Sequence, residues 1–182
     1  MSIPTHYAAT LVVDDFGIKY GTKEDANHLL DTLKKVYQIT EDWSGTKYVG
    51  LTIDINRQKR TLAISIPGYV DRALKRFNVT KLDRDTHSPL IFPPIRYGQK
   101  YQKPKPEDTT PRVGPEQKKF IQQVIGTFLF YARAIDNTML LGLNKLGIQQ
   151  AQPTEQTMED VHRFLQYCAT IPLPQLNSKL QT

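Results

Sequence analysis

The residues best suited to chemistry are two adjacent aspartates, Asp14 and Asp15, which stand between two short apolar runs. Residues 11–13 and 17–20 have the composition of strands, so the pair is expected at the tip of a tight β-hairpin. Aspartate is common in turns because its carboxylate accepts hydrogen bonds from nearby backbone N–H groups, and that is one interpretation. The other is that neighbouring carboxylates need a cation, since Mg²⁺ is typically held by one or two carboxylates plus substrate phosphates.

Other kinds of site are absent from the sequence pattern. The chain has four histidines and a single cysteine, Cys168, and their spacing matches no zinc motif. No glycine-rich phosphate loop of the P-loop or dinucleotide type is present. The histidines and the cysteine are therefore expected to be surface or packing residues.

The positive charge is concentrated in the middle of the chain. The net charge is +6, and residues 57–105 hold twelve Lys and Arg against three acids, a local +9 that leaves −3 elsewhere. A basic segment of this kind indicates a polyanionic partner, although a solvated surface is equally compatible with the charge alone. Tyr97 and Tyr101 lie among these cations and could stack on bases, with a solvated loop as the alternative.

Composition indicates a folded chain of one domain or one piece of a larger one. It has 182 residues, 39% of them hydrophobic. A lone cysteine excludes an internal disulfide and suits a reducing compartment. No signal peptide and no run of about 18 apolar residues is visible, so we expect an intracellular protein that is not secreted and has no membrane partner.

The elements that would position the aspartates follow from periodicity. A capping box of Thr22 and Asp25 predicts a helix over residues 24–37. Residues 47–66 read as a second hairpin with a polar turn at 56–59, in which residues 48–53 form one alternating strand. Pro67 is expected to open a helix whose outer face carries basic side chains, namely Arg72, Lys75 and Arg76.

The second half of the chain reads as helical. Residues 89–115 hold seven of the twelve prolines and are expected to form an extended loop. Pro115 then opens the longest helix, with an apolar stripe from Phe120 to Ile135, and two further helices follow, the last ending before Pro172. The order of hairpin, helix, hairpin and helices predicts an α+β fold.

Several ordered segments resemble the reverse transcriptase of copia-type LTR retrotransposons. V-V-D-D between strands is similar to the Y-x-D-D turn of that family, and Y-V-G-L-T-I-D-I stands in place of its L-G-I-x-I strand. F-I-Q-Q-V-I-G-T-F-L-F-Y-A-R resembles Y-R-x-x-V-G-S-L-L-Y-L-x-x-x-R, which follows the polymerase core. The resemblance runs from about Leu11 to Tyr167, most of the chain.

The resemblance implies an RNA-directed DNA polymerase, a nucleotidyltransferase, of which this chain is a fragment. Residues 1–66 would be the C-terminal part of the palm with the primer-grip hairpin, 67–135 thumb-like helices, and 136–182 the start of a connection segment. Asp14 and Asp15 would be the catalytic, Mg²⁺-binding aspartates. Primer-grip residues would be Tyr48, Val49, Gly50 and Leu51, and residues facing nucleic acid would be Arg72, Lys75, Arg76, Arg96 and Lys100.

The implied partners are an RNA or DNA primer–template and the N-terminal polymerase half of a polyprotein, in the cytoplasm within a virus-like particle or in the nucleus. Two departures matter: Val12 replaces the tyrosine of the motif, and none of the thirteen residues before Asp14 is acidic. The polymerase needs another metal-binding aspartate and fingers, so we expect the isolated chain to be inactive and its Mg²⁺ binding to be weak.

Two alternatives stay open. The chain could be a decayed or domesticated module that binds nucleic acid or protein without catalysis, or a small interaction module unrelated to polymerases. Coding sequence upstream would separate them: a strand with an aspartate and a basic fingers region there would restore the enzyme, whereas a start fixed at Met1 favours the non-catalytic survivor.

Overall fold

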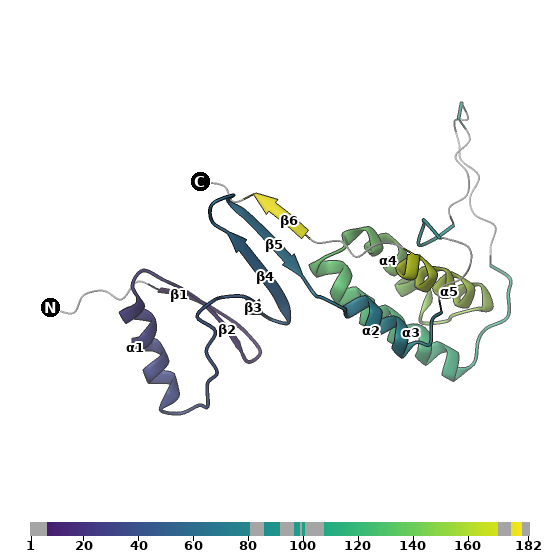
Figure 1. The fold of residues 1–182 in the computed structure, drawn as a ribbon. Helices are drawn as coiled ribbons and strands as arrows, with labels where there is room; N and C mark the ends of the chain where they lie inside the picture. Colours follow the sequence, from purple (N-terminus) through teal and green to yellow (C-terminus); the bar gives the residue numbers. More distant parts are fainter. Residues whose placement is uncertain are drawn as a thin grey trace. The chain divides into compact units, whose positions relative to one another are not determined.

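The computed structural model describes residues 7–80, 86–91, 97–98, 100, 108–170 and 176–179. They divide between two compact units, Met1–Ser65 with Asn177–Thr182, and Ile66–Leu176. Antiparallel strands and one helix make up the described part of the first unit, and helices dominate the second (Figure 1). The predicted α+β class is therefore confirmed.

The predicted first hairpin is present. Strands β1 (Tyr7–Val12) and β2 (Asp15–Tyr20) pair antiparallel, with Val12 opposite Asp15 and Tyr7 opposite Tyr20. This register leaves a loop of two residues, Val13 and Asp14. The two aspartates are thus divided between the turn and the first position of β2.

Helix α1 (Lys23–Lys34) begins at the predicted capping box. The Asp25 N–H donates to Thr22 Oγ1 and the Thr22 N–H donates to Asp25 Oδ2, each at 3.3 Å. The helix was expected to reach residue 37, but it ends at Lys34 because the N–H groups of Val36 and Tyr37 both donate to the Leu33 carbonyl in a closing turn.

The second sheet has the order β3-β4-β5-β6, with strands β3 (Lys47–Tyr48), β4 (Leu51–Asn56), β5 (Thr61–Ser65) and β6 (Leu176–Lys179). The expected continuous strand over 48–53 is wrong. Val49 and Gly50 have φ of +51° and +75°, so they form a tight turn that places Tyr48 opposite Leu51. Strand β6 comes from the tail and had no sequence signal.

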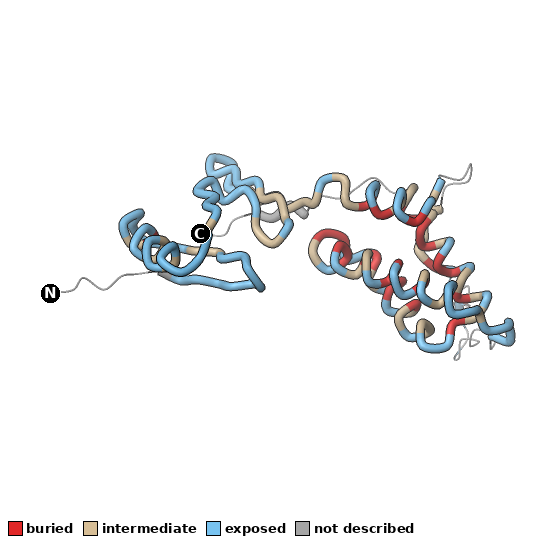
Figure 2. Tube along the Cα trace, turned by 90° about the horizontal axis from the view of Figure 1, so that it is seen from below, coloured by how far each residue is buried: buried red, intermediate tan, exposed pale blue. Residues whose placement is uncertain are grey.

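The first unit has little core. Ala26 is the only buried residue among those described in this unit, and the other described positions are exposed or half-buried (Figure 2). Leu11 and Phe16, a cross-strand pair near the hairpin tip, are 57% and 47% exposed. One apolar face of the β1–β2 hairpin is therefore open at this end.

The second unit has a well-packed helical core. Its helices are α2 (Tyr69–Arg76), α3 (Pro115–Ala134), a 3-10 helix η1 (Asn137–Met139), α4 (Leu140–Gln149) and α5 (Glu155–Thr170). Aromatic rings meet at its centre, where Phe128 contacts both Phe77 and Phe164. The core also buries aliphatic side chains from five segments, among them Val70, Leu90, Ile121, Val124, Leu143, Leu146, Val161 and Leu165.

The helix predictions are largely confirmed. Helix α3 begins at Pro115 and buries most of the expected stripe, while Phe120 and Leu129 are only half-buried. Tyr131, which the pattern did not select, is buried. Helix α2 begins at Tyr69 rather than Pro67, because Gly68 has a φ of +68° and separates the proline from the helix.

Candidate metal and nucleic-acid sites

The carboxylates of Asp14 and Asp15 have no partner within the described part of the chain. Both residues are exposed, and no hydrogen bond or ion pair from a described group reaches either of them. Asp42 shows what a turn aspartate does instead: it accepts from the N–H groups of Ser44, Thr46 and Lys47. The tip carboxylates therefore do not serve the turn by capping backbone donors.

Val13, the first residue of the two-residue turn, has a strained backbone. Its φ is +57°, a region that suits glycine and costs a residue with a β-carbon roughly 1–2 kcal/mol. Its side chain is 90% exposed, so no packing offsets the strain. Strain of this kind often accompanies functional sites. Glycine is the usual residue at the first position of a two-residue turn in which only that position has a positive φ. The valine at position 13 is therefore a departure that the sequence itself shows.

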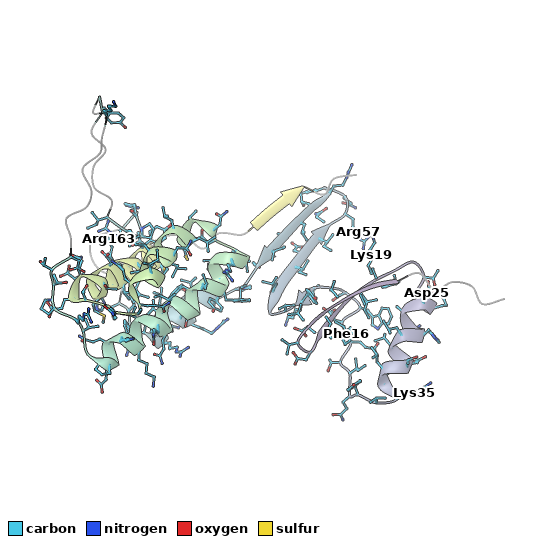
Figure 3. All side chains as sticks on the ribbon, turned by 180° about the vertical axis from the view of Figure 1, so that it is seen from behind. Phe16, Lys19, Asp25, Lys35, Arg57 and Arg163 are labelled. Carbon is cyan, nitrogen blue, oxygen red and sulfur yellow. The ribbon has the colours of Figure 1, made fainter. Side chains whose placement is uncertain are left out.

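Asp15 lies on the polar face of the β1–β2 hairpin. Because side chains alternate along a strand, Asp15 shares this face with Gly17 and Lys19 of β2 and with Thr10 of β1. Figure 3 labels Lys19 on this face and Phe16 on the opposite, apolar one. We name Val13, Asp14 and Asp15 the carboxylate tip.

Tyr48 packs on the same polar face. Its hydroxyl lies 2.9 Å from Thr10 Oγ1, and a β-carbon on Gly17 would come within 3.1 Å of its ring. Glycine at position 17 is thus what allows the ring to approach the strand so closely. The structure therefore brings two residues predicted for different roles, Asp15 and Tyr48, onto one face of the first unit.

The remaining residues expected in the primer grip form the turn after Tyr48. Val49 and Gly50 are the two turn residues, and Leu51 begins β4 half-buried. Glycine is free to adopt the positive φ at position 50, whereas Val49 is strained there in the same way as Val13. The first unit thus holds two tight turns that each carry a strained valine.

The carboxylate tip offers an incomplete set of metal ligands. Asp14 and Asp15 are free oxygen donors of the type Mg²⁺ prefers, and they could fill one or two of its six positions. Within the described ranges, no group of three or more His, Cys, Asp or Glu is placed to hold a metal ion. Cys168 is buried, and this burial raises the pKa of its thiol well above the usual range.

The three α2 cations lie on the solvent side of the helix, as predicted. Arg72, Lys75 and Arg76 are exposed, whereas Val70 and Ala73 of the same helix are buried. We name the three cations the α2 basic face. Two of them are oriented by local contacts, since Arg72 Nη1 donates to the Pro67 carbonyl at 3.2 Å and the Arg76 guanidinium lies 5.6 Å from the Phe77 ring centre.

Tyr69 anchors α2 to α3 beside this face. Its hydroxyl donates to the Thr127 carbonyl at 2.7 Å, and its ring stacks on Tyr131 at 5.5 Å. Burial raises the pKa of Tyr69, and Arg72 and Arg76 act in the opposite direction. Of the other predicted cations, Lys100 is exposed and Arg96 lies outside the described residues.

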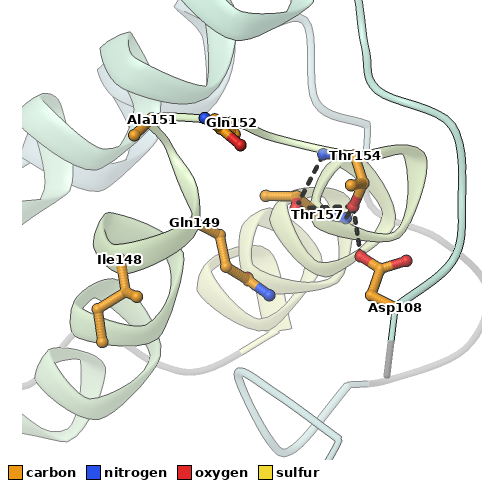
Figure 4. A pocket seen from close by; sticks show the side chains of 7 residues that line it. All are labelled: Asp108, Ile148, Gln149, Ala151, Gln152, Thr154 and Thr157. Carbon is orange, nitrogen blue, oxygen red and sulfur yellow. Dashed lines mark hydrogen bonds between the residues drawn. The ribbon is translucent and has the colours of Figure 1, made fainter. Parts of the chain in front are cut away.

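A small open pocket in the second unit was not predicted from the sequence. It has a volume of about 290 Å³ and lies between the end of α4 and the start of α5 (Figure 4). Thr154 Oγ1 donates to Asp108 Oδ2 at 2.5 Å, and the Thr154 N–H donates to Thr157 Oγ1 at 3.2 Å. The first bond fastens the segment before α3 to the start of α5, and the second caps the first turn of α5. Gln149 Oε1, from another lining residue, is buried without a hydrogen-bond partner among the described residues.

Comparison with known proteins identifies no relative: no protein-family model, no curated protein and no solved structure matches this chain. Among the helices of the described residues, none has both the length and the apolar character needed to cross a membrane.

Proposed function

We propose that this chain is a part of an RNA-directed DNA polymerase of the copia type, contributing palm carboxylates and a grip on the primer–template. The observation that carries the proposal is the carboxylate tip, where two exposed carboxylates without a described partner follow a strained valine. A turn that served only to reverse the chain would favour glycine at position 13 and would not require a second acid beside Asp14.

The chemistry of the tip supports a role with a divalent cation. Asp14 and Asp15 would hold Mg²⁺, which would neutralise charge on the phosphates of an incoming nucleotide. Tyr48 would keep the hairpin in position, because its ring and hydroxyl contact the face that bears Asp15. The α2 basic face would contact the nucleic-acid backbone without reading its sequence.

A metal titration tests the proposal directly. Mn²⁺ added to the 182-residue chain should broaden the NMR amide signals of the carboxylate tip before those near other acids, and excess Mg²⁺ should reverse the broadening. The matched control is Asp54, a single exposed carboxylate in β4 of the same unit. The double change Asp14→Asn and Asp15→Asn should abolish the effect at the tip, and Asp54→Asn should not.

Broadening no stronger at the tip than at Asp54 would remove the metal role. An activity assay adds a second check, since two carboxylates alone cannot hold two metal ions about 3.5–4 Å apart. The isolated chain should therefore show no template-dependent incorporation with Mg²⁺ or Mn²⁺. Incorporation by this chain that Asp14→Ala abolishes would contradict our assignment of an incomplete site.

A second candidate function is favoured by the α2 basic face alone. This face lies on the unit with the well-packed core, so it could bind nucleic acid in a module without catalysis. A module of this kind should bind primer–template and plain duplex with equal affinity. Changes at the carboxylate tip should leave that affinity unaffected. The polymerase proposal expects Mg²⁺-dependent preference for a primer terminus, lost in the tip variants.

A further inference from the structure

The outer edge of β1 is an unprotected sheet edge. Within the described part of the chain, β1 and β2 form a two-stranded sheet, so each has one unpaired side. Strand β1 has the sequence YAATLV, with no charge and no proline, whereas β2 carries Asp15 and Lys19. Charged residues, lysine above all, and proline are the usual means by which an edge strand resists pairing. Only β2 has such protection.

The hairpin register determines which backbone groups of β1 point outward. In a two-residue hairpin the closing pair, here Val12 and Asp15, is hydrogen-bonded, and bonded and non-bonded pairs then alternate. Thr10 therefore bonds to β2, whereas the N–H and C=O groups of Leu11, Ala9 and Tyr7 face away from it. These three outward positions belong to the apolar face of the hairpin.

The apolar face gives the same edge a reason to pair. Leu11 and Phe16 are large, adjacent across the strands and about half exposed. A two-stranded hairpin is marginal by itself, and three or more strands with an apolar face are needed for independent stability. An added strand at β1 would satisfy the outward backbone groups, widen the sheet and bring apolar side chains of the two strands side by side on one face.

We propose that the occupant of this edge is a second copy of the chain, paired antiparallel through β1 about a two-fold axis at Ala9. In this register Ala9 lies opposite the Ala9 position of the other copy, and Leu11 lies opposite its position 7. The pairing joins two hairpins into a four-stranded sheet with one continuous apolar face. Self-pairing suits the strand because an uncharged sequence meets itself without repulsion.

The same geometry separates the acidic tips. Asp14 is five residues from Ala9, and a strand rises about 3.4 Å per residue, so the two tips lie about 30 Å apart at opposite ends of the pair. This is about three Debye lengths at 0.1 M salt, so their charges do not oppose association. Pairing through β2 is less suitable, because Asp15 and Lys19 lie on that strand and Tyr48 packs against Gly17.

Position 9 and its neighbour provide a matched test. Ala8 and Ala9 are both exposed, so changes there remove no core contact. The two Ala9 α-carbons would be about 5.5 Å apart across the axis, within the range that a disulfide spans, whereas Ala8 would lie opposite Thr10 of the other copy. Under mild oxidation Ala9→Cys should therefore give a linked dimer at least about tenfold faster than Ala8→Cys. Buried Cys168 does not compete.

Sedimentation equilibrium of the full chain provides the second measurement. The unmodified chain should show a monomer–dimer equilibrium, which Ala9→Glu weakens by about fivefold because two glutamates then stand directly opposite. Ala8→Glu adds the same charge on the polar face, opposite Lys19 of its own hairpin, and should change the equilibrium little. Equal cross-linking at positions 8 and 9 would overturn the proposal. Equal weakening by the two glutamates, or a monomer at every concentration, would overturn it as well.

Discussion

Replacing Val13 by glycine should stabilise the first hairpin. Val13 has a φ of +57°, and the left-handed region costs a residue with a β-carbon roughly 1–2 kcal/mol. A β-branched side chain belongs at the upper end of that range. Glycine removes this cost but loses about 0.5–1 kcal/mol through its freer unfolded chain. The net gain is about 1 kcal/mol.

Val13 is well suited to this measurement because its side chain is 90% exposed, so its removal deletes almost no packing. Hydrogen exchange of the Thr10 and Gly17 amides reports the opening of the ladder, since these residues face each other across it. A gain of about 1 kcal/mol slows their exchange about fivefold at 25 °C. The exchange of α3 amides in the second unit provides an internal reference.

Val13→Ala is the matched control. Alanine keeps the β-carbon and therefore keeps most of the strain, so exchange at Thr10 and Gly17 should stay close to that of the unmodified chain. Exchange that is unchanged or faster in Val13→Gly would refute the argument from strain. An equal slowing by glycine and alanine would show that side-chain size, and not backbone strain, limits the hairpin.

Three further predictions follow from particular contacts. Asp42 has its pKa lowered from 3.8 to about 2, chiefly by the Ser44 hydroxyl, so its contribution to loop stability is present above pH 3.8 and lost as pH falls through 2. The amide shifts of Thr46 and Lys47, which donate to Asp42 Oδ2, should titrate with a midpoint near 2, and a midpoint near 3.8 would contradict this. Replacing all three residues of the α2 basic face by alanine should weaken duplex binding, and it should reduce the slope of log affinity against log salt concentration by about 2–3, as measured by fluorescence anisotropy. An unchanged slope would exclude these cations as phosphate contacts. Amide hydrogens of residues 7–65 should exchange faster than those of residues 115–168, because Ala26 is the only described residue buried in the first unit. Uniformly slow exchange in a monomer would show that the first unit has a core that this structure lacks.

The sequence predicted an element correctly where the residues that determine it lie within a few positions of one another. The hairpin around Asp14, the capping box of Thr22 and Asp25, and the start of α3 at Pro115 were all predicted, because each depends on turn or helix-end chemistry written in adjacent positions. The cations of α2 were placed correctly for the same reason, since helical periodicity separates them from Val70 and Ala73.

Prediction failed where backbone conformation overrode alternation. Residues 48–53 alternate as a strand does, yet the positive φ of Val49 and Gly50 turns the chain after Tyr48. A valine at such a position contradicts its usual preference, so composition could not reveal the turn. Strand β6 was missed because its pairing with β5 joins segments more than a hundred residues apart, and no local pattern records such a contact.

The thin core of the first unit bears on every role proposed for it. A metal site needs carboxylates held in a fixed geometry. The hairpin that carries Asp14 and Asp15, however, belongs to a unit with one buried residue among those described. Whatever binds the folded hairpin must therefore also stabilise it, by an amount that grows with ligand concentration over Kd. A cation at the tip and a second strand at β1 use different parts of the hairpin, one at its end and one along its edge. Because the paired tips lie about three Debye lengths apart, the two events do not oppose each other electrostatically. Mg²⁺ and self-association should therefore each slow hydrogen exchange at the Thr10 and Gly17 amides, and their stabilising free energies should add when both are present. If Mg²⁺ abolished the protection that self-association gives, or the reverse, the two would share a site.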